Sequence, residues 1–216
     1  GADDRDDLDP QLLATIRASG LFRHFVPESH GGLGLSVTRL ALIRERFAYH
    51  SVAADELFVS QGIPVQPIVL FGSPEQHATY LPGLLDGTRL FSFCLTEPDA
   101  GSDVLALRTT ARREGDGYVL DGTKRYAFAG DQADVLLVFA KTGDPATRGD
   151  ISAFLFDRPP SGITARPFPL LAPGPEWELH FDRCVIPATS MLGEPGQGTR
   201  IALGNLDRLR PSVGAA

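Results

Sequence analysis

The hydrophobic residues of this 216-residue chain change their spacing near residue 90. Before this point they recur with the spacing of amphipathic helices, and beyond it they form short alternating runs such as LFSFCLTE, ADVLLVFAK and ISAFLFDR. After about residue 196 the helical spacing returns. The pattern predicts an α+β fold: a helical N-terminal domain over residues 1–89, an antiparallel β-barrel or sandwich domain over 90–195, and the start of a C-terminal helical domain over 196–216.

Local signals mark where the helices of the first part begin and end. Asp9 is a candidate N-cap, with a proline at the first helical position after it. Ser73 opens a capping box, SPEQ, and we expect the helix that it begins to end before Pro82. A further helical stretch is expected to be interrupted by Pro64 and Pro67. In the second part, Gly115-Asp116-Gly117 and Asp121-Gly122 are turn signals on either side of a short predicted strand.

Composition excludes several classes of protein. Apolar residues make up 43% of the chain and charged residues 22%, as in ordinary globular proteins, and the net charge of −7 disfavours nucleic acid and anionic membranes as partners. No stretch has the length and apolarity of a membrane-spanning helix, and the acidic start GADDRDDLDP is unlike a signal or transit peptide. The two cysteines and five histidines show no disulfide framework or metal-ligand spacing. We therefore expect a cytoplasmic protein without a metal.

The densest polar stretch is CLTEPDAGSD, residues 94–103, directly after an apolar run. One interpretation is a plain type I turn whose short side chains bond the local backbone. The other is a loop that leaves a strand at the junction of the two domains and holds a polar ligand. The length of the motif favours the binding loop.

Four segments in this order resemble the acyl-CoA dehydrogenase family: PESHGGLG, LTEPDAGSD, GTKRYAFAG and NLDRLRP. The resemblance runs from about Leu8 to the end of the chain. Family members have a helical N-terminal domain, a β middle domain and a C-terminal four-helix domain. This sequence supplies the first two and only the opening of the third.

The resemblance implies FAD as the cofactor and gives LTEPDAGSD a role. Thr96 would hydrogen-bond the pyrimidine edge of the flavin, helped by backbone groups of Leu95 and Thr96. Ser102 would reach the cofactor's phosphate region or the substrate, and Gly101 would let the backbone come close to the ligand. Donors at the pyrimidine edge stabilise the negative charge that develops there on reduction.

The segment GTKRYAFAG matches the family less faithfully. Tyr126 can take the place of the aromatic residue that lies near the flavin. Two positions later the family has a serine or threonine that hydrogen-bonds flavin N5, and here this residue is Phe128. A backbone amide could serve N5 instead, or the chain could bind flavin in an altered way or not at all. Without the resemblance, RYAFAG reads as a strand with alternating packing.

The last matched segment, NLDRLRP, would contact the substrate. The resemblance implies that Asp207 and Arg210, which share one helix face, touch the pantetheine arm or organise the acyl-thioester pocket. An exposed ion pair on a helix surface is the alternative interpretation.

The family's reaction is α,β-dehydrogenation of an acyl thioester. Its catalytic carboxylate comes from the C-terminal domain, so we name no catalytic residue here, and the electrons pass on to an electron acceptor. The sequence therefore predicts a flavin-dependent dehydrogenase of acyl-CoA or carrier-protein-bound thioesters, or a part of one. The alternative is a non-redox protein that binds an acyl thioester or a partner on the same scaffold.

The final helix leads to a prediction about assembly. Its apolar residues Ile201, Leu203, Leu206 and Leu209 are expected to form one face that packs on further helices. A helix that leaves such a face in water would form an interface. The sequence therefore predicts a homo-oligomer, or a partner chain that supplies the C-terminal domain.

Overall fold

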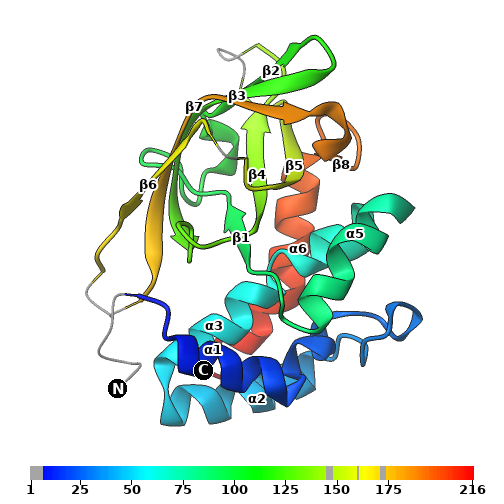
Figure 1. Ribbon diagram of the computed structural model, residues 1–216, viewed down its shortest axis with the longest axis vertical. Coiled ribbons are helices and arrows are strands. Elements are labelled where there is room, and N and C mark those ends of the chain that lie inside the picture. The colour runs from blue at the N-terminus through cyan, green and yellow to red at the C-terminus, as the bar shows by residue number, and fades with distance from the viewer. Residues whose placement is uncertain (1–6, 145–147, 160, 171–173) are drawn as a thin grey trace.

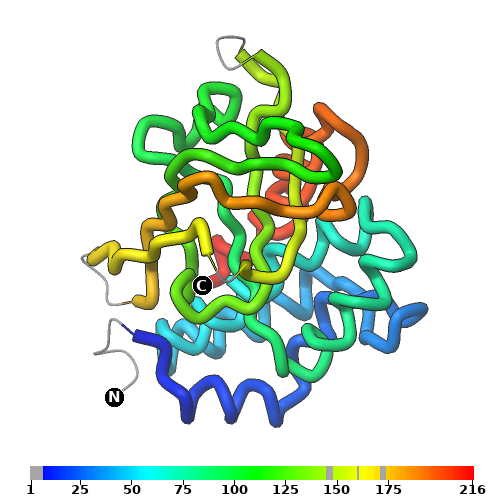
Figure 2. Tube along the Cα trace, turned by 45° about the horizontal axis from the view of Figure 1, so that its top comes forward, coloured from blue at the N-terminus to red at the C-terminus, as the bar shows by residue number. Residues whose placement is uncertain are grey.

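The computed structural model describes residues 7–144, 148–159, 161–170 and 174–216. Most helices gather at one end of the molecule and the strands at the other (Figure 1). Figure 2 shows the same division from a second direction, with the blue and cyan helices on the lower side. The helices are α1 (Pro10–Ser19), α2 (Val37–His50), α3 (Val52–Gly62), α4 (Val65–Phe71), α5 (Pro74–Leu85) and α6 (Gly198–Val213). Short 3-10 helices lie at Leu21–Phe25, Glu28–His30, Val104–Ala106 and Ala188–Ser190.

The β region is one eight-stranded sheet in the described residues, in the order β6-β7-β3-β2-β4-β5-β8, with β1 also paired to β4. Its strands are β1 (Phe91–Cys94), β2 (Thr110–Glu114), β3 (Gly117–Phe128), β4 (Val135–Lys141), β5 (Ile151–Asp157), β6 (Ile163–Pro167), β7 (Glu176–Pro187) and β8 (Met191–Leu192). The predicted order, helices first and sheet second, is confirmed. The sheet is mixed, because β1 and β2 each pair with β4 in parallel. It is not closed into a barrel.

β4 explains how the two regions share a core. Its residues alternate between two hydrophobic clusters: Val135, Leu137 and Phe139 belong to the cluster that includes the helices, while Leu136 and Val138 face the interior of the β region. A strand buried on both faces needs an unbroken apolar run, and VLLVFA is such a run. The helical and β regions therefore pack on each other through a continuous apolar contact, with the segment after β1 lying at their border.

The predicted helix caps are confirmed. The Asp9 side chain accepts hydrogen bonds from the backbone N–H groups of Gln11 and Leu12 at 2.8 and 3.2 Å. Ser73 and Gln76 form the reciprocal capping box at the start of α5. These caps satisfy backbone donors that have no partner within the helix, so a short sequence signal is enough to place them.

Pro64 interrupts the helical stretch as predicted, since α3 ends at Gly62, but the predictions from Pro67 and Pro82 were wrong. α4 begins directly after Pro64, and Pro67 is its third residue, where the backbone N–H has no intrahelical acceptor to lose. α5 continues past Pro82 to Leu85. Its last turn carries Leu84, which is buried in the core, and that packing offsets the hydrogen bond that the proline removes.

The predicted turn at Asp121-Gly122 is also wrong, whereas the turn at residues 115–116 joins β2 to β3. β3 runs straight through Asp121, and the irregularity lies in its partner β7, which has one extra residue between the register pairs Leu120–Cys184 and Gly122–Phe181. Within that bulge the Arg183 backbone N–H donates to Asp121 Oδ1 at 2.8 Å. The polar pair therefore marks a β-bulge and not a chain reversal.

The prediction for the last helix needs a correction. Ile201 and Leu209 are buried against this chain itself, and of the four apolar residues named only Leu203 is exposed. α6 packs on α2, α4 and β5, and Asn205 Nδ2 donates to the Ile63 carbonyl oxygen at 2.8 Å. The apolar face of α6 thus has its packing partners within the described chain, and it no longer argues for a further chain.

Candidate functional site

The polar loop after β1 turns tightly on itself. Glu97 and Ala100 form an isolated antiparallel bridge, in which the Glu97 N–H donates to the Ala100 carbonyl at 2.9 Å and the Ala100 N–H donates back at 3.3 Å. Pro98 and Asp99 are the exposed tip of this turn. The prediction of a loop that leaves a strand is confirmed, since no residue from 95 to 103 belongs to a named helix or strand.

A buried ion pair fixes the loop to β3. Lys124 Nζ donates to Glu97 Oε1 at 2.7 Å and to the Leu95 carbonyl at 3.0 Å. The Glu97 carboxylate also accepts from the backbone N–H groups of Arg108, at 2.6 Å, and Thr109, at 3.0 Å. The side chains of Lys124 and Glu97 are 0% and 5% exposed, so this pair is shielded from solvent.

The contacts between the two side chains favour their charged forms. Burial alone would raise the pKa of Glu97, but the Lys124 charge and the hydrogen bonds outweigh burial and leave that pKa below its usual value. Burial lowers the pKa of Lys124, and Glu97 opposes that shift. Three N–H donors stabilise the charged form of a carboxylate more than its protonated form, so the charged form fits this geometry.

Three predicted cofactor contacts in this loop are not used by the chain's own packing. In the part of the chain that the structure describes, no residue hydrogen-bonds the hydroxyl of Thr96 or of Ser102. A Cβ added at Gly101 would meet no atom within 4 Å, and its φ is not in the left-handed region. The loop thus presents two hydroxyls and an open backbone face, as a polar ligand would need.

The structure places Tyr126 and Phe128 in different environments. The Arg125 N–H donates to the Thr96 carbonyl at 2.8 Å, so Tyr126 follows directly on the contact between loop and strand. Tyr126 is 47% exposed with φ of 56°, and its ring meets Phe168 edge-on with centroids 5.0 Å apart. The Phe128 side chain is 5% exposed and lies in the shared core. Only its backbone is therefore available to a ligand beside Tyr126.

Asp207 and Arg210 lie apart from this loop. Arg210 Nη1 donates to Asp207 Oδ1 at 3.3 Å on α6, and both side chains are more than half exposed. No hydrogen bond among the described residues joins them to the segment 95–103. An exposed pair of this kind contributes little to stability. Breaking it to bind a ligand would therefore cost little.

A second titratable pair was not predicted from the sequence. Glu56 on α3 and Glu176 at the start of β7 lie within hydrogen-bonding reach of each other, beside Phe128, which is the register partner of Glu176. Burial and the neighbouring Glu56 raise the pKa of Glu176 to about 7, and burial raises that of Glu56. Glu176 Oε2 is buried without a hydrogen-bond partner. Two such carboxyl groups cannot both ionise easily, because each disfavours the charged form of the other.

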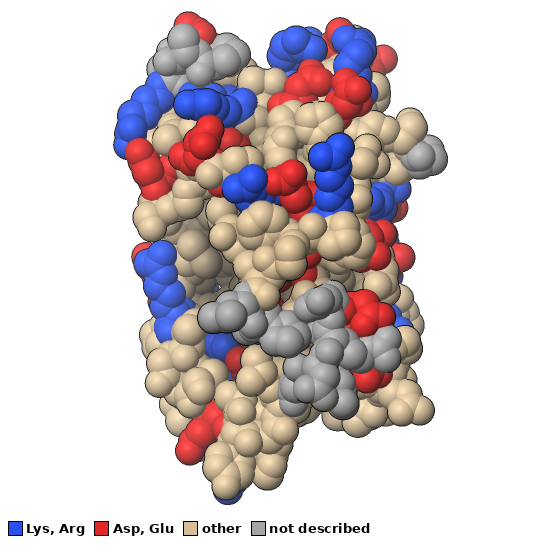
Figure 3. Space-filling view, turned by 90° about the vertical axis from the view of Figure 1, so that its left-hand side faces the viewer, with Lys and Arg blue, Asp and Glu red and all other residues tan. Residues whose placement is uncertain are grey.

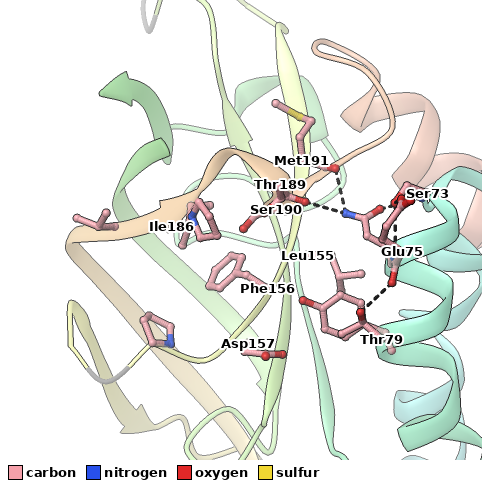
Figure 4. Close-up of a pocket in the computed structure, with 15 residues that line it drawn as sticks. Ser73, Glu75, Thr79, Leu155, Phe156, Asp157, Ile186, Thr189, Ser190 and Met191 are labelled. Atoms are coloured by element: carbon pink, nitrogen blue, oxygen red, sulfur yellow. Dashed lines mark hydrogen bonds between the residues drawn. The ribbon is translucent and has the colours of Figure 1, made fainter. Parts of the chain in front are cut away.

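A cavity lies elsewhere, between α5 and the strands β5, β7 and β8 (Figure 4). Its volume is about 630 Å³. Gln76 bridges its wall by donating to the backbone carbonyls of Thr189, at 3.2 Å, and Met191, at 3.1 Å. None of the predicted cofactor or substrate residues lines this cavity. The loop after β1 therefore remains the candidate site, because it carries the predicted ligand-binding groups and this cavity does not.

The described residues hold no group of His, Cys, Asp and Glu side chains that could bind a metal ion. No helix among them is long and apolar enough to span a bilayer.

On the face drawn in Figure 3, basic and acidic side chains are interspersed over the β region and sparser below it. Opposite charges on that face therefore partly cancel.

Comparison with known proteins identifies the family. One family model, the N-terminal domain of acyl-CoA dehydrogenases, matches residues 1–88, and a second, the middle domain, matches residues 92–184. The chain belongs to the acyl-CoA dehydrogenase family. An acyl-CoA dehydrogenase of Bacillus subtilis (strain 168) is 34% identical over 97% of this chain and 56% of the relative. This chain thus spans about half the length of the curated relatives that it matches.

Solved structures of the same family superpose on nearly the whole chain. An acyl-CoA dehydrogenase complexed with FAD from Bacillus anthracis is 34% identical with a TM-score of 0.85, over 95% of this chain and 36% of that one. A prolyl acyl carrier protein oxidase, AnaB, is 27% identical with a TM-score of 0.86, over 99% of this chain and 58% of that one. These similar structures thus include an FAD complex and an acyl carrier protein oxidase.

Proposed function

We propose that this chain carries the flavin-binding part of an enzyme that dehydrogenates acyl thioesters between the α and β carbons. The observation that supports it best is the loop after β1, where the hydroxyls of Thr96 and Ser102 and the open side of Gly101 have no use in the chain's own packing. A FAD-binding relative with the same fold adds to this support. When bound, FAD supplies the two-electron acceptor that this reaction requires.

The chain's own residues would then bind and orient the flavin. Thr96, with the backbone of Leu95, would hydrogen-bond the pyrimidine edge, and Ser102 would bind the phosphate region or the substrate. Tyr126, exposed beside the loop, would stack near the ring system, and the backbone at Phe128 would replace the missing hydroxyl. Because the Phe128 side chain is buried, we assign no direct contact to it.

The substrate side of the proposal concerns α6. Asp207 and Arg210 would hold the pantetheine arm of coenzyme A or of a carrier protein, which they can do because both are exposed. The carrier-bound alternative is supported by the similarity to a prolyl carrier-protein oxidase. The catalytic base stays unassigned, and the cytoplasmic location, the electron acceptor and the oligomeric state stay predictions from the sequence.

A spectrum tests the proposal against a non-redox binding protein on the same scaffold. We expect the purified protein, supplied with FAD, to retain visible flavin absorbance after gel filtration and to bleach on reduction. A colourless protein that still binds an acyl thioester would contradict the proposal and support the non-redox alternative.

A further inference from the structure

We propose that Lys124 and Glu97 act as a positioning pair: Lys124 holds the Leu95 carbonyl inward, and this directs the Thr96 backbone N–H outward as a hydrogen-bond donor for the flavin. The inference rests on the proposed function, since it concerns the same loop. It adds two residues that touch no ligand themselves and act through the peptide between Leu95 and Thr96.

The peptide bond between Leu95 and Thr96 fixes the direction of the Thr96 N–H. In a trans peptide the carbonyl and the following N–H point in opposite directions. The Leu95 carbonyl accepts from Lys124 Nζ at 3.0 Å, and Lys124 is fully buried, so this carbonyl faces the interior. The Thr96 N–H must then face the other way. Among the described residues it has no hydrogen-bond acceptor, and it is free to donate to a ligand.

The surrounding contacts keep this peptide from turning over. The next carbonyl, of Thr96, accepts from the backbone of Arg125, so two consecutive carbonyls are held by neighbouring residues of β3. Glu97 holds Lys124 in place at 2.7 Å and clamps the returning chain through the N–H groups of Arg108 and Thr109. Rotation of the Leu95–Thr96 peptide would leave a buried ammonium group without one of its acceptors, which is costly.

A double variant distinguishes the positioning of the Leu95–Thr96 peptide from the effect of leaving one buried charge unpaired. Lys124→Met or Glu97→Gln alone leaves one buried charge unpaired and destabilises the fold whatever the role of the pair. Lys124→Met combined with Glu97→Gln removes both charges and also removes the donor to the Leu95 carbonyl. The matched control is Arg44→Met combined with Asp55→Asn, which neutralises a second buried ion pair, with its atoms 2.6 Å apart, between α2 and α3.

We expect the Lys124/Glu97 double variant to fold and to bind FAD roughly tenfold more weakly, the effect typical of one misplaced hydrogen bond. With the site saturated, its flavin midpoint potential should be more negative, because a lost donor at the ring disfavours the reduced form. The Arg44/Asp55 control should keep both the affinity and the potential. Equal affinity and potential in the two double variants would overturn the positioning role.

FAD binding by the unsubstituted protein and hydrogen exchange at Thr96 distinguish a failure of the positioning role from a failure of the proposed function. If the unsubstituted protein binds no FAD, the proposed function fails before any variant is made, and the positioning role fails with it. If the unsubstituted protein binds FAD but the double variant does not fold, amide hydrogen exchange decides. Slower exchange of the Thr96 N–H when FAD is added would support the proposal, and unchanged exchange would overturn it.

Discussion

Replacing Glu176 by glutamine should stabilise the protein above neutral pH. Glu176 faces Glu56 across the border of α3 and β7, and its pKa is raised to about 7 from an ordinary value of 4.5. A carboxyl whose folded-state pKa exceeds its unfolded-state pKa adds stability below pH 4.5 and loses it as the pH rises through 7. Glutamine carries no charge at any pH, so the variant should escape this loss.

The magnitude follows from the size of the pKa change. One pKa unit corresponds to about 1.4 kcal/mol, so the rise from 4.5 to about 7 corresponds to roughly 3 kcal/mol as an upper limit. Glu176 is only partly buried and its titration depends on that of Glu56, and we therefore expect about 2 kcal/mol at pH 8 and close to zero at pH 4. Asp55 on α3 adds negative charge to the same region.

Urea unfolding at pH 4, 6 and 8 measures this difference. The free energy of unfolding of Glu176→Gln should exceed that of the unsubstituted protein by an amount that grows from pH 4 to pH 8. Glu194→Gln is the control, because Glu194 is exposed, and such a substitution should change stability by less than about 0.5 kcal/mol at every pH. A difference that does not change with pH would refute the interpretation that burial and Glu56 raise the pKa of Glu176.

Three other substitutions probe the loop and the helical core. Thr96→Val should weaken FAD binding by about 0.5–1.5 kcal/mol in an absorbance titration, the net value of one hydrogen bond, and unchanged binding would count against the Thr96 assignment. Gly101→Ala should leave the melting temperature almost unchanged, because a Cβ there meets no atom within 4 Å, while a bound flavin would be displaced and its affinity would fall. Asp55→Ala leaves Arg44 buried without its partner and should cost about 3–5 kcal/mol in chemical unfolding; a loss below 1 kcal/mol would show that solvent reaches the guanidinium.

Local signals predicted the parts of the fold that depend on few neighbours. The caps at Asp9 and Ser73 were found because a cap joins residues two or three positions apart. The predicted end of α5 before Pro82 was wrong because the packing of α5 on the core decides where that helix ends. Short-range sequence patterns do not include that packing. The prediction that the apolar face of α6 packs on further helices was wrong for the same reason, since its partners α2 and α4 lie far away in the sequence.

The candidate site was predictable in part. The loop 95–103 was visible as a polar stretch after an apolar run, and the family resemblance predicted which of its residues would face a ligand. Its anchor was not visible, because Lys124 lies 27 residues from Glu97 in sequence and reads as an ordinary strand residue. The Glu56–Glu176 pair had no signal either, since the two glutamates come from different regions that meet only in the folded chain.

The bulge in β3 connects the anchor to the exposed aromatic residue. In a regular strand, residues two apart point to the same face, so Lys124 and Tyr126 would both be buried or both exposed. Between Lys124 and Ala127, however, β3 has one residue more than β7, and Tyr126 takes a left-handed φ of 56°. This extra residue turns the Tyr126 ring outward while Lys124 stays fully buried. A single bulge thus lets neighbouring residues of one strand hold the loop after β1 from inside and expose an aromatic ring on the outside, where we propose that the flavin binds. A left-handed φ at a bulky residue is strained and persists only where the surrounding structure enforces it, and here it coincides with the register shift between β3 and β7.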